Sequence, residues 1–271
     1  VKIGLPIPYG IIVSTTACNQ YFKDGEKLSE SLKEEILKNI QILENATGKK
    51  IQSENPLLVS VRSGAPVSMP GMMDTILNLG FNDYVAQKML DITGDEEFVY
   101  SSYLRFVQMF SEITEGIDRK RFTELKSDNY KDQINEGKQI YKNECGKEFP
   151  ENFEEQIFYA VKAIFESWNN DRAILYRKLN NIDNNMGTAV IIQEMVFGNL
   201  NEKSGTGVLF TRNPSTGEDK IFGEVLLNAQ GEDIVAGIRT PDDINLLKTT
   251  MPVIYDELVK TTKKLEKHNK D

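Results

Sequence analysis

The stretch from Leu57 to Gly80, LLVSVRSGAPVSMPGMMDTILNLG, holds an unusual density of conformationally demanding residues. Its first five residues form a short apolar run rich in β-branched side chains, which predicts a buried strand. Arg62 follows that run and precedes a Ser-Gly pair, so a guanidinium lies beside backbone N–H groups. This combination suits phosphate oxygens, although one arginine after a strand is also a common partner in a surface ion pair.

The second half of the stretch predicts a shaped loop followed by a short helix. In Met69–Met73, Pro70 fixes φ and Gly71 leaves it free, and two such neighbours are typical of a tight loop. Asp74 is a residue type that caps helix N-termini. We therefore expect a short helix over Thr75–Leu79.

Helical periodicity dominates the chain up to about residue 180. Four apolar residues between Leu32 and Leu43 fall at helical spacing, and Gly48 follows them as a helix stop. Near the end of this region, Arg172, Arg177 and Lys178 are expected to form the solvated face of a helix. The expected helices are one from Ser14 through Tyr21, Ser29–Thr47, Asp83–Thr93, Asp95–Ile117, Glu154–Trp168 and Asp171–Leu179, with weak helical periodicity over Tyr130–Tyr141.

The pattern changes from helical to strand-like at Gly187. From Pro241 onward, apolar residues recur at spacings of three, four or seven, which predicts a helix lying on the new sheet. The chain is therefore expected to be α+β. The expected strands are Ile11–Ser14, Thr188–Phe197, GVLFTR from Gly207, and Lys220–Asn228.

Composition narrows the possible functions. The 271 residues are 39% hydrophobic and carry a net charge of −9, which argues against nonspecific nucleic-acid binding and requires local positive charge for any polyanion. No run of about 18 apolar residues and no basic leader is found, so no membrane span or signal peptide is expected. Cys18 and Cys145 have neither disulfide nor metal spacing, and a reducing cytoplasm is expected.

Five long words stand out along the sequence. In chain order they are SVRSGAPVSMPGMMDTILNLG, SYLRFVQMF, IIQEMVFGN, SGTGVLFTRNPSTGE and GEVLLNAQGEDIVAGIRTP. Together they resemble the N-terminal nucleotide-binding domain of the pyruvate phosphate dikinase family, and the resemblance is loosest from about Glu115 to Glu155.

The resemblance implies an ATP-grasp-like, two-lobe nucleotide-binding domain with a helical insertion. Its expected parts are a first lobe over residues 1–82, a helical insertion over 83–150, a return to the first lobe over 151–192, and a second lobe over 193–271.

The resemblance also implies ATP-contacting residues in both lobes. Arg62 and Arg105 would hold phosphates. The implied adenine contacts are Gln193, Glu194, Met195 and Val196, and the implied phosphate-covering loop is Ser204, Gly205, Thr206 and Gly207. Without the resemblance, Arg105 reads as a helix-surface arginine, residues 193–196 as a buried strand, and the Ser-Gly-Thr-Gly segment as a hairpin connection or an anion-binding nest. The segment is not a Walker motif, because no Gly-Lys-Ser/Thr follows it.

Further polar residues suggest phosphate or metal contacts. Glu224, Glu232 and Asp233 could bind Mg²⁺ or orient a ribose, although acidic residues beside Gln-Gly are also common in turns. Arg212 and Arg239 are further candidate phosphate partners. The metal ligands are not assigned by the sequence.

The expected activity is that of a phosphotransferase domain that uses Mg-ATP to phosphorylate a histidine on a separate, swivelling domain of the same chain. The family reaction implied by the resemblance converts ATP, phosphate and pyruvate to AMP, pyrophosphate and phosphoenolpyruvate, and a homodimer is expected of the full-length enzyme. His268, the only histidine, does not match the family's phosphorylated histidine. Two alternatives stay open: a phosphoenolpyruvate synthase-like dikinase and a non-catalytic nucleotide-binding module.

The ends of the sequence lead to one more expectation. The family's glycine-rich segment with its ATP-contacting lysine would precede Val1, and acidic, Gln and Arg residues of the closing strands would follow Asp271. Because phosphoryl transfer depends on positioning and charge neutralisation, we expect weak nucleotide binding and negligible turnover from these 271 residues alone.

Overall fold

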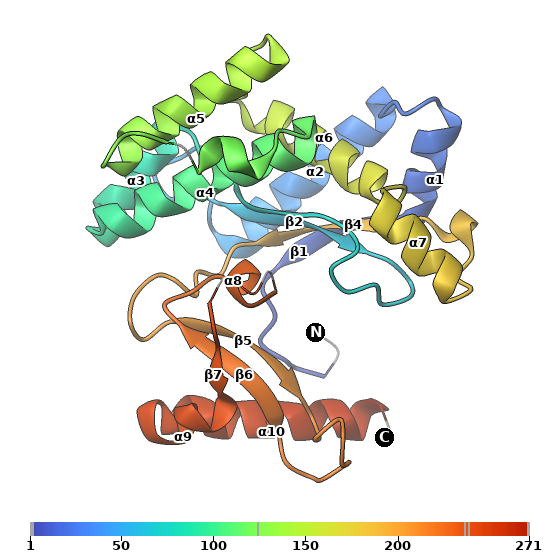
Figure 1. The fold of residues 1–271 in the computed structure, drawn as a ribbon, viewed down its shortest axis with the longest axis vertical. Helices are drawn as coiled ribbons and strands as arrows, with labels where there is room; N and C mark the ends of the chain where they lie inside the picture. Colours follow the sequence, from blue (N-terminus) through green and yellow to red (C-terminus); the bar gives the residue numbers. More distant parts are fainter. Residues whose placement is uncertain (1–2, 124, 236, 238, 270–271) are drawn as a thin grey trace. The chain divides into compact units, whose positions relative to one another are not determined.

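The chain forms two compact units in a computed structural model that describes residues 3–123, 125–235, 237 and 239–269 (Figure 1). One unit is Pro8–Met195, called the first unit here. The other, the second unit, combines Val1–Ile7 with Val196–Asp271. The four-part division expected from the sequence stays a prediction.

The first unit is built on a four-stranded antiparallel sheet with the strand order β1-β4-β2-β3. The expected strand at the start of the Leu57 stretch is β2, and it lies in the interior of the sheet. The last strand, β4, ends at Glu194 and is therefore shorter than expected. The strands are β1 (Gly10–Val13), β2 (Val59–Gly64), β3 (Thr75–Leu79) and β4 (Ala189–Glu194).

Helices cover one face of this sheet (Figure 1). Val59 and Val61 on β2 are fully buried beneath them, and α6 packs directly on that strand. The helix caps follow the sequence closely: Ser29 accepts from the N–H of Leu32, and Gly48 ends the same helix with φ +69°. The helices are α1 (Thr15–Lys23), α2 (Glu30–Thr47), α3 (Asp83–Thr93), α4 (Glu96–Glu115), α5 (Tyr130–Cys145), α6 (Phe153–Ser167) and α7 (Asp171–Leu179), with 3-10 turns η1 (Arg119–Phe122) and η2 (Asn184–Met186).

The helix expected over Thr75–Leu79 is wrong, because this segment is strand β3. Ile76 pairs with Val61 of β2 and is fully buried. Asp74 caps no helix and instead forms an ion pair with Arg172 at 3.0 Å. Pairing with the neighbouring strand, which a local capping signal cannot anticipate, decides this segment. The shaped loop before it is confirmed, since Gly71 has φ +71° within a tight turn.

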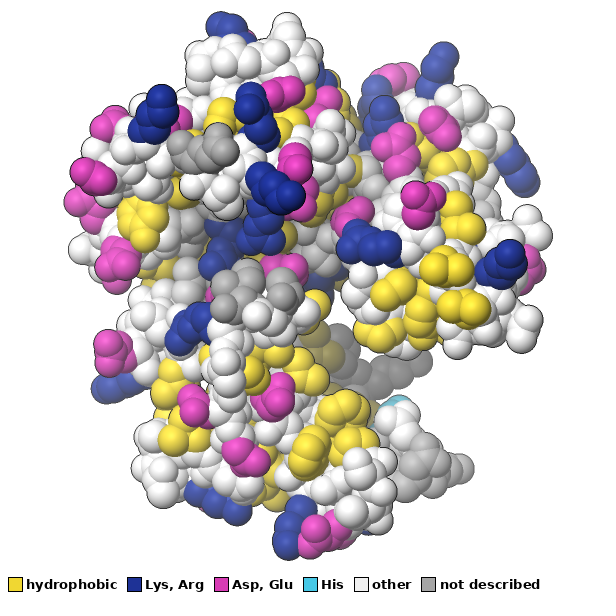
Figure 2. Space-filling view, viewed as in Figure 1, with side chains coloured by type: hydrophobic (Ala, Val, Ile, Leu, Met, Phe, Trp, Pro, Cys, Tyr) yellow, Lys and Arg dark blue, Asp and Glu magenta, His cyan; other side chains and the backbone are white. Residues whose placement is uncertain are grey.

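The solvated charged face expected for α7 is also wrong in part. Arg177 is 2% exposed, and its guanidinium lies 4.1 Å from the centre of the Trp168 ring. The helix exposes apolar side chains instead, and Figure 2 shows hydrophobic side chains gathered at the surface over α7. These exposed residues are Ile174, Leu175 and Leu179.

The second unit is a small sheet with the strand order β5-β6-β7. Val225, Ile244 and Leu247 form its core, against which Met251 and Leu258 pack, so the expected helix on the sheet is confirmed from Pro252 onward. The residues just after Pro241 differ from that expectation, because they form a short strand and turns. The elements are β5 (Gly205–Phe210), β6 (Phe222–Leu227), α8 (Gly231–Val235), β7 (Asp242–Asp243), η3 (Ile244–Leu246), α9 (Leu247–Thr250) and α10 (Pro252–Asn269).

None of the helices in the described ranges combines the length and the hydropathy that a membrane crossing requires. Both cysteines are free thiols, Cys18 buried and Cys145 partly buried.

Candidate functional site

One face of the first sheet carries no helix from the described residues of its own unit, and it is called the helix-free face here. Side chains alternate along β2, so Arg62 points away from the buried side chains of Val59 and Val61. The strand register places Arg62 opposite Ile191, which in turn lies opposite Ile12 of β1. Ile12 is 70% exposed, which marks this face as accessible within the first unit. Residues Ile12, Arg62, Ile191 and Gln193 define the helix-free face.

Arg62 is exposed and is held by an amide. Its Nη2 donates to Oε1 of Gln193, and Nε2 of Gln193 donates to the Pro8 carbonyl at 3.0 Å. The amide is therefore fixed at both ends and orients the guanidinium. Because the Gln193 amide is neutral, this contact leaves the positive charge of Arg62 uncompensated, unlike the surface ion pair considered from the sequence.

Arg105 lies on a different element. It is half-buried on α4, the helix that packs on β3, and it has a partner within the protein. The phosphate role of Arg105 stays a prediction.

The segment expected to contact adenine uses two of its backbone donors internally. The N–H of Glu194 donates to the Tyr9 carbonyl and that of Met195 to the Leu58 carbonyl, both at 2.9 Å. The Glu194 carboxylate pairs with Lys49 at 2.8 Å. Met195 is 8% exposed whereas Val196 is 69% exposed. A ligand donor from this segment would therefore have to come from Val196 rather than from Glu194 or Met195.

The loop expected over Ser204–Gly207 is wrong in conformation, because Gly205, Thr206 and Gly207 lie in strand β5 and pair with β6. A Cβ at Gly207 would lie 2.7 Å from the carbonyl oxygen of Glu224, so the glycine permits a close approach of the two strands. Ser204 precedes the strand, and its N–H donates to the Asn201 carbonyl at 2.9 Å. A nest of convergent N–H groups does not form here, and the ATP contact of these residues stays a prediction.

The three acidic residues considered as metal or ribose ligands do different things in the structure. Asp233 is buried, and its Oδ2 accepts from the N–H of Gln230 at 2.8 Å, which caps the start of α8. Glu224 is exposed on β6, in register with Asp243 of β7. Within the described ranges, no three His, Cys, Asp or Glu side chains gather as metal ligands would. Glu232 has an interaction partner within the protein.

The two further arginines of the second unit already have partners. Arg212 forms ion pairs with Glu266 of α10 and, at 3.9 Å, with Asp219. Arg239 donates to the Asn228 carbonyl at 2.9 Å. Both guanidinium groups therefore already stabilise the second unit through contacts within it. His268 is exposed near the end of α10.

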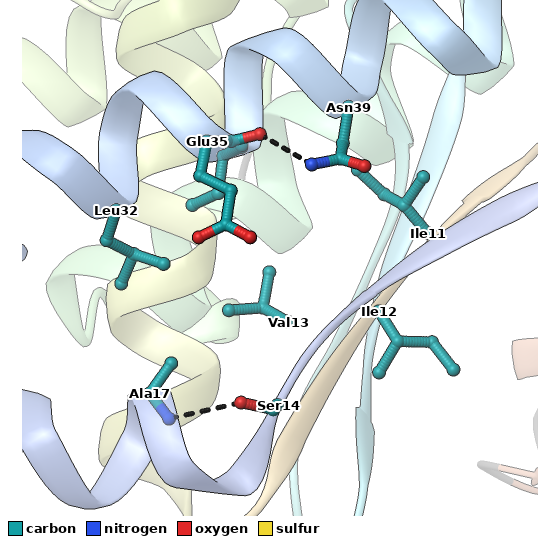
Figure 3. Close-up of a pocket in the computed structure, with 9 residues that line it drawn as sticks. Ile11, Ile12, Val13, Ser14, Ala17, Leu32, Glu35 and Asn39 are labelled. Carbon is teal, nitrogen blue, oxygen red and sulfur yellow. Dashed lines mark hydrogen bonds between the residues drawn. The ribbon is translucent and has the colours of Figure 1, made fainter.

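A hollow of about 300 Å³ lies between β1 and α2 (Figure 3). Two of its polar side chains bond to backbone nearby in sequence: Oγ of Ser14 accepts from the N–H of Ala17 at 3.3 Å, and Nδ2 of Asn39 donates to the Glu35 carbonyl at 2.8 Å. These bonds hold α1 and α2 and show no ligand-directed arrangement.

The loop after β2 is anchored by residues that sequence reasoning missed. Met69 is buried against Trp168, and Nδ2 of Asn170 donates to the Met72 carbonyl at 3.1 Å. Arg172 holds Asp74 at the end of the loop. The Asn170 and Arg172 bonds join residues 98 positions apart in sequence, so no local pattern could have revealed them.

Asp74 provides a pH-dependent test of this anchoring. Burial raises the pKa of its carboxyl above the ordinary value of 3.8, and Arg172 only partly offsets the effect. Between those two pKa values the folded state binds more protons than the unfolded state, so the free energy of unfolding falls as pH rises through that window. We expect Asp74→Asn to show a shallower fall in this window, measured by urea unfolding at a series of pH values.

Burial also raises the pKa of Glu112, and the Asp74 carboxylate adds to that increase, so Asp74→Asn removes this contribution as well and makes the fall shallower in the same direction. Parallel pH profiles for the two proteins would mean that Asp74 does not titrate with folding.

The protein belongs to the α+β class and has two units, each with its own sheet and helices. The helix-free face of the first sheet carries the oriented guanidinium of Arg62. The chain belongs to the family of the pyruvate phosphate dikinase AMP/ATP-binding domain, whose model matches residues 26–271.

Several curated relatives match nearly the whole chain. Pyruvate, phosphate dikinase from Clostridium symbiosum is 47% identical over 287 aligned residues, which cover 99% of this chain and 33% of that protein. The chloroplastic enzymes of Mesembryanthemum crystallinum and Arabidopsis thaliana are each 47% identical, over 100% of this chain and 30% of theirs. The chain thus spans about a third of the length of the relatives that it matches.

Proposed function

We propose that this chain is the ATP-grasp nucleotide-binding part of a pyruvate phosphate dikinase. It would hold Mg-ATP while phosphoryl groups pass to a histidine on a swivelling domain of the same protein. The full reaction would convert ATP, phosphate and pyruvate to AMP, pyrophosphate and phosphoenolpyruvate. One observation carries the proposal: a chain of an AMP/ATP-binding family presents an exposed, amide-held Arg62 on a sheet face without helices.

In this proposal Arg62 neutralises phosphate charge. A guanidinium presents a fixed fork of donors, and its fixed position avoids reorganisation when charge develops on the transferred group. Arg105 would supply a second phosphate contact. Thr206 and the neighbouring Ser204, Gly205 and Gly207 would lie over the phosphates from the edge strand β5.

We assign the adenine and metal contacts to groups that are not already bonded within the protein. The exposed Val196 would donate its N–H to the base, while Met195 would pack against the ring, with Gln193 and Glu194 fixing the strand that precedes them. The described residues do not fit a preformed Mg²⁺ site. Mg²⁺ would therefore arrive as the counter-ion of the ATP phosphates, with Glu224 as a candidate ligand.

Calorimetric titration of the 271-residue chain with a Mg-bound, non-hydrolysable ATP analogue tests the proposal. We expect saturable binding with one site per chain. A titration without binding heat, repeated at a second temperature to exclude a vanishing enthalpy, would contradict nucleotide binding by this chain.

A phosphoenolpyruvate synthase-like dikinase is the second candidate function. The names of the relatives favour the phosphate-dependent enzyme. Phosphoenolpyruvate formation by the full-length protein separates the two, because only the phosphate-dependent enzyme requires inorganic phosphate. A non-catalytic nucleotide-binding module would bind ATP and form no phosphoenolpyruvate under either condition.

We also propose a homodimeric, cytoplasmic full-length enzyme. The two free cysteines are compatible with a reducing compartment. Relatives named as chloroplastic indicate that the compartment differs among members of the family.

A further inference from the structure

A second pocket of the first unit shares no lining residue with the helix-free face. Its volume is about 350 Å³, and it lies between α1 and the residues on either side of α7. Two of its lining residues are aromatic and four are asparagines. They are Asn19, Phe22, Lys23, Trp168, Asn169, Asn184 and Asn185.

A buried positive charge lies behind this pocket. The Arg177 guanidinium is 2% exposed, and its recorded partners are neutral oxygens: Oδ1 of Asn184 at 2.8 Å, Oδ1 of Asn169 at 3.5 Å, and the Trp168 carbonyl. Burial lowers the pKa of Arg177. All three partners line the pocket, so the positive charge of Arg177 lies one residue away from the cavity and orients the groups that face it.

The same bonds orient amide donors. Because Asn184 and Asn169 each give an oxygen to Arg177, the amide NH₂ group of each is left to donate elsewhere. Lys23 adds an exposed ammonium from the last turn of α1. Among the described residues, the Asp183 carboxylate accepts from the side chain of Asn185, one of the lining residues, at 3.0 Å.

The charges around the pocket limit the net charge of a ligand that could bind there. Lys23 and Arg177 supply two positive charges, and Asp183 supplies one negative charge, so the surroundings favour a monoanion over a dianion. Amide NH₂ groups suit the two oxygens of a planar carboxylate. The half-buried Phe22 offers apolar ring surface to the rest of the molecule, whereas Trp168, which is 2% exposed, adds little further surface.

We propose that this pocket binds a small monocarboxylate whose apolar body lies against Phe22. Its carboxylate accepts from Lys23 and from the NH₂ groups of Asn169 and Asn184. The site is independent of the nucleotide contacts proposed above. It is coupled to the loop after β2, because Trp168 packs on Met69.

The chain contains a built-in reporter for this site. Trp168 is its only tryptophan, and the indole N–H donates to the Asn184 carbonyl at 3.0 Å. A ¹H–¹⁵N spectrum therefore shows one indole signal, from a group in the pocket wall. We would follow that signal while titrating the 271-residue chain with phenylacetate, with its neutral isostere phenylacetamide, and with inorganic phosphate.

We expect phenylacetate to shift the indole signal saturably and phenylacetamide to bind at least about tenfold more weakly, the fold-change of one lost charge-assisted hydrogen bond. Lys23→Gln and Asn169→Ala should each weaken phenylacetate binding, by about tenfold and severalfold respectively. Asp183→Asn should strengthen it. The matched control Lys142→Gln, on α5, should leave it unchanged.

Four outcomes would overturn the proposal. If none of the probes shifts the indole signal, the pocket is not a binding site for these ligands. Equal binding of the acid and the amide would exclude carboxylate recognition. Binding that is unchanged in Lys23→Gln and Asn169→Ala would place the probe elsewhere, and tighter binding of phosphate than of phenylacetate would assign the pocket to phosphate. Arg62→Ala should leave the phenylacetate response intact, so failure here and failure of nucleotide binding are distinguishable.

Discussion

Arg62→Ala is expected to weaken binding of the Mg-bound ATP analogue by about 1.5 to 3 kcal/mol, or roughly 10- to 150-fold. The guanidinium is exposed on the helix-free face and bonded to a neutral amide, so it can give charge-assisted hydrogen bonds to phosphate. Calorimetric titration of the variant beside the unaltered chain measures the loss directly.

The matched control is Arg121→Ala. Arg121 is also exposed in the first unit, but it pairs with Glu144 at 2.8 Å. We expect its removal to leave nucleotide binding unchanged, because surface ion pairs contribute little. If both variants bind like the unaltered chain, or if both lose affinity equally, Arg62 has no specific phosphate contact. Urea unfolding of both variants separates loss of binding from loss of folding.

Gln156→Leu is expected to lower the free energy of unfolding by about 3 to 5 kcal/mol, a large part of the stability of an ordinary domain. Gln156 is fully buried on α6. Its Nε2 donates to the carbonyls of Phe81 and Pro150, both at 2.9 Å, and its Oε1 accepts from the N–H of Gly80 at 3.0 Å. Leucine has a similar volume, so the main effect is three unpaired backbone groups.

Gln87→Leu is the control for that change. Gln87 lies on the exposed side of α3, where its amide donates to Asp91 at 2.9 Å. Its replacement should alter stability by no more than about 0.5 kcal/mol. Urea midpoints of the two variants are compared under one condition, and a loss below about 1 kcal/mol for Gln156→Leu would show that water or a local shift satisfies these groups.

Local signals accounted for most helix boundaries. The Gly48 stop is found as expected, and Ser29 and Asp95, where two of the expected helices begin, cap α2 and α4 through contacts within a few residues of the chain. The turn at Pro70-Gly71 is likewise set by two residues whose backbone preferences need no distant partner. The exposure of Arg62 also follows from alternation along a strand that is buried on its other face.

The failures share a cause, which is competition from contacts distant in sequence. Thr75–Leu79 has a capping aspartate before it, yet it becomes a strand because β2 offers it a pairing edge. The glycines of the Ser204–Gly207 segment suggested a loop, whereas they serve the close approach of β5 to β6. Arg177 was expected in solvent, but the carbonyl and ring of Trp168 and the amide of Asn184 accommodate it inside.

The sequence by itself determined the α+β class, the helix stop at Gly48, the turn before β3 and the family, because these depend on residues adjacent in the chain or on words read in order. The tertiary structure alone decided the amide of Gln193 that orients Arg62, the burial of Gln156 and the charged wall of the Trp168 pocket. Each of these joins elements far apart in sequence, and a polar group is stable there only if the fold supplies its partner.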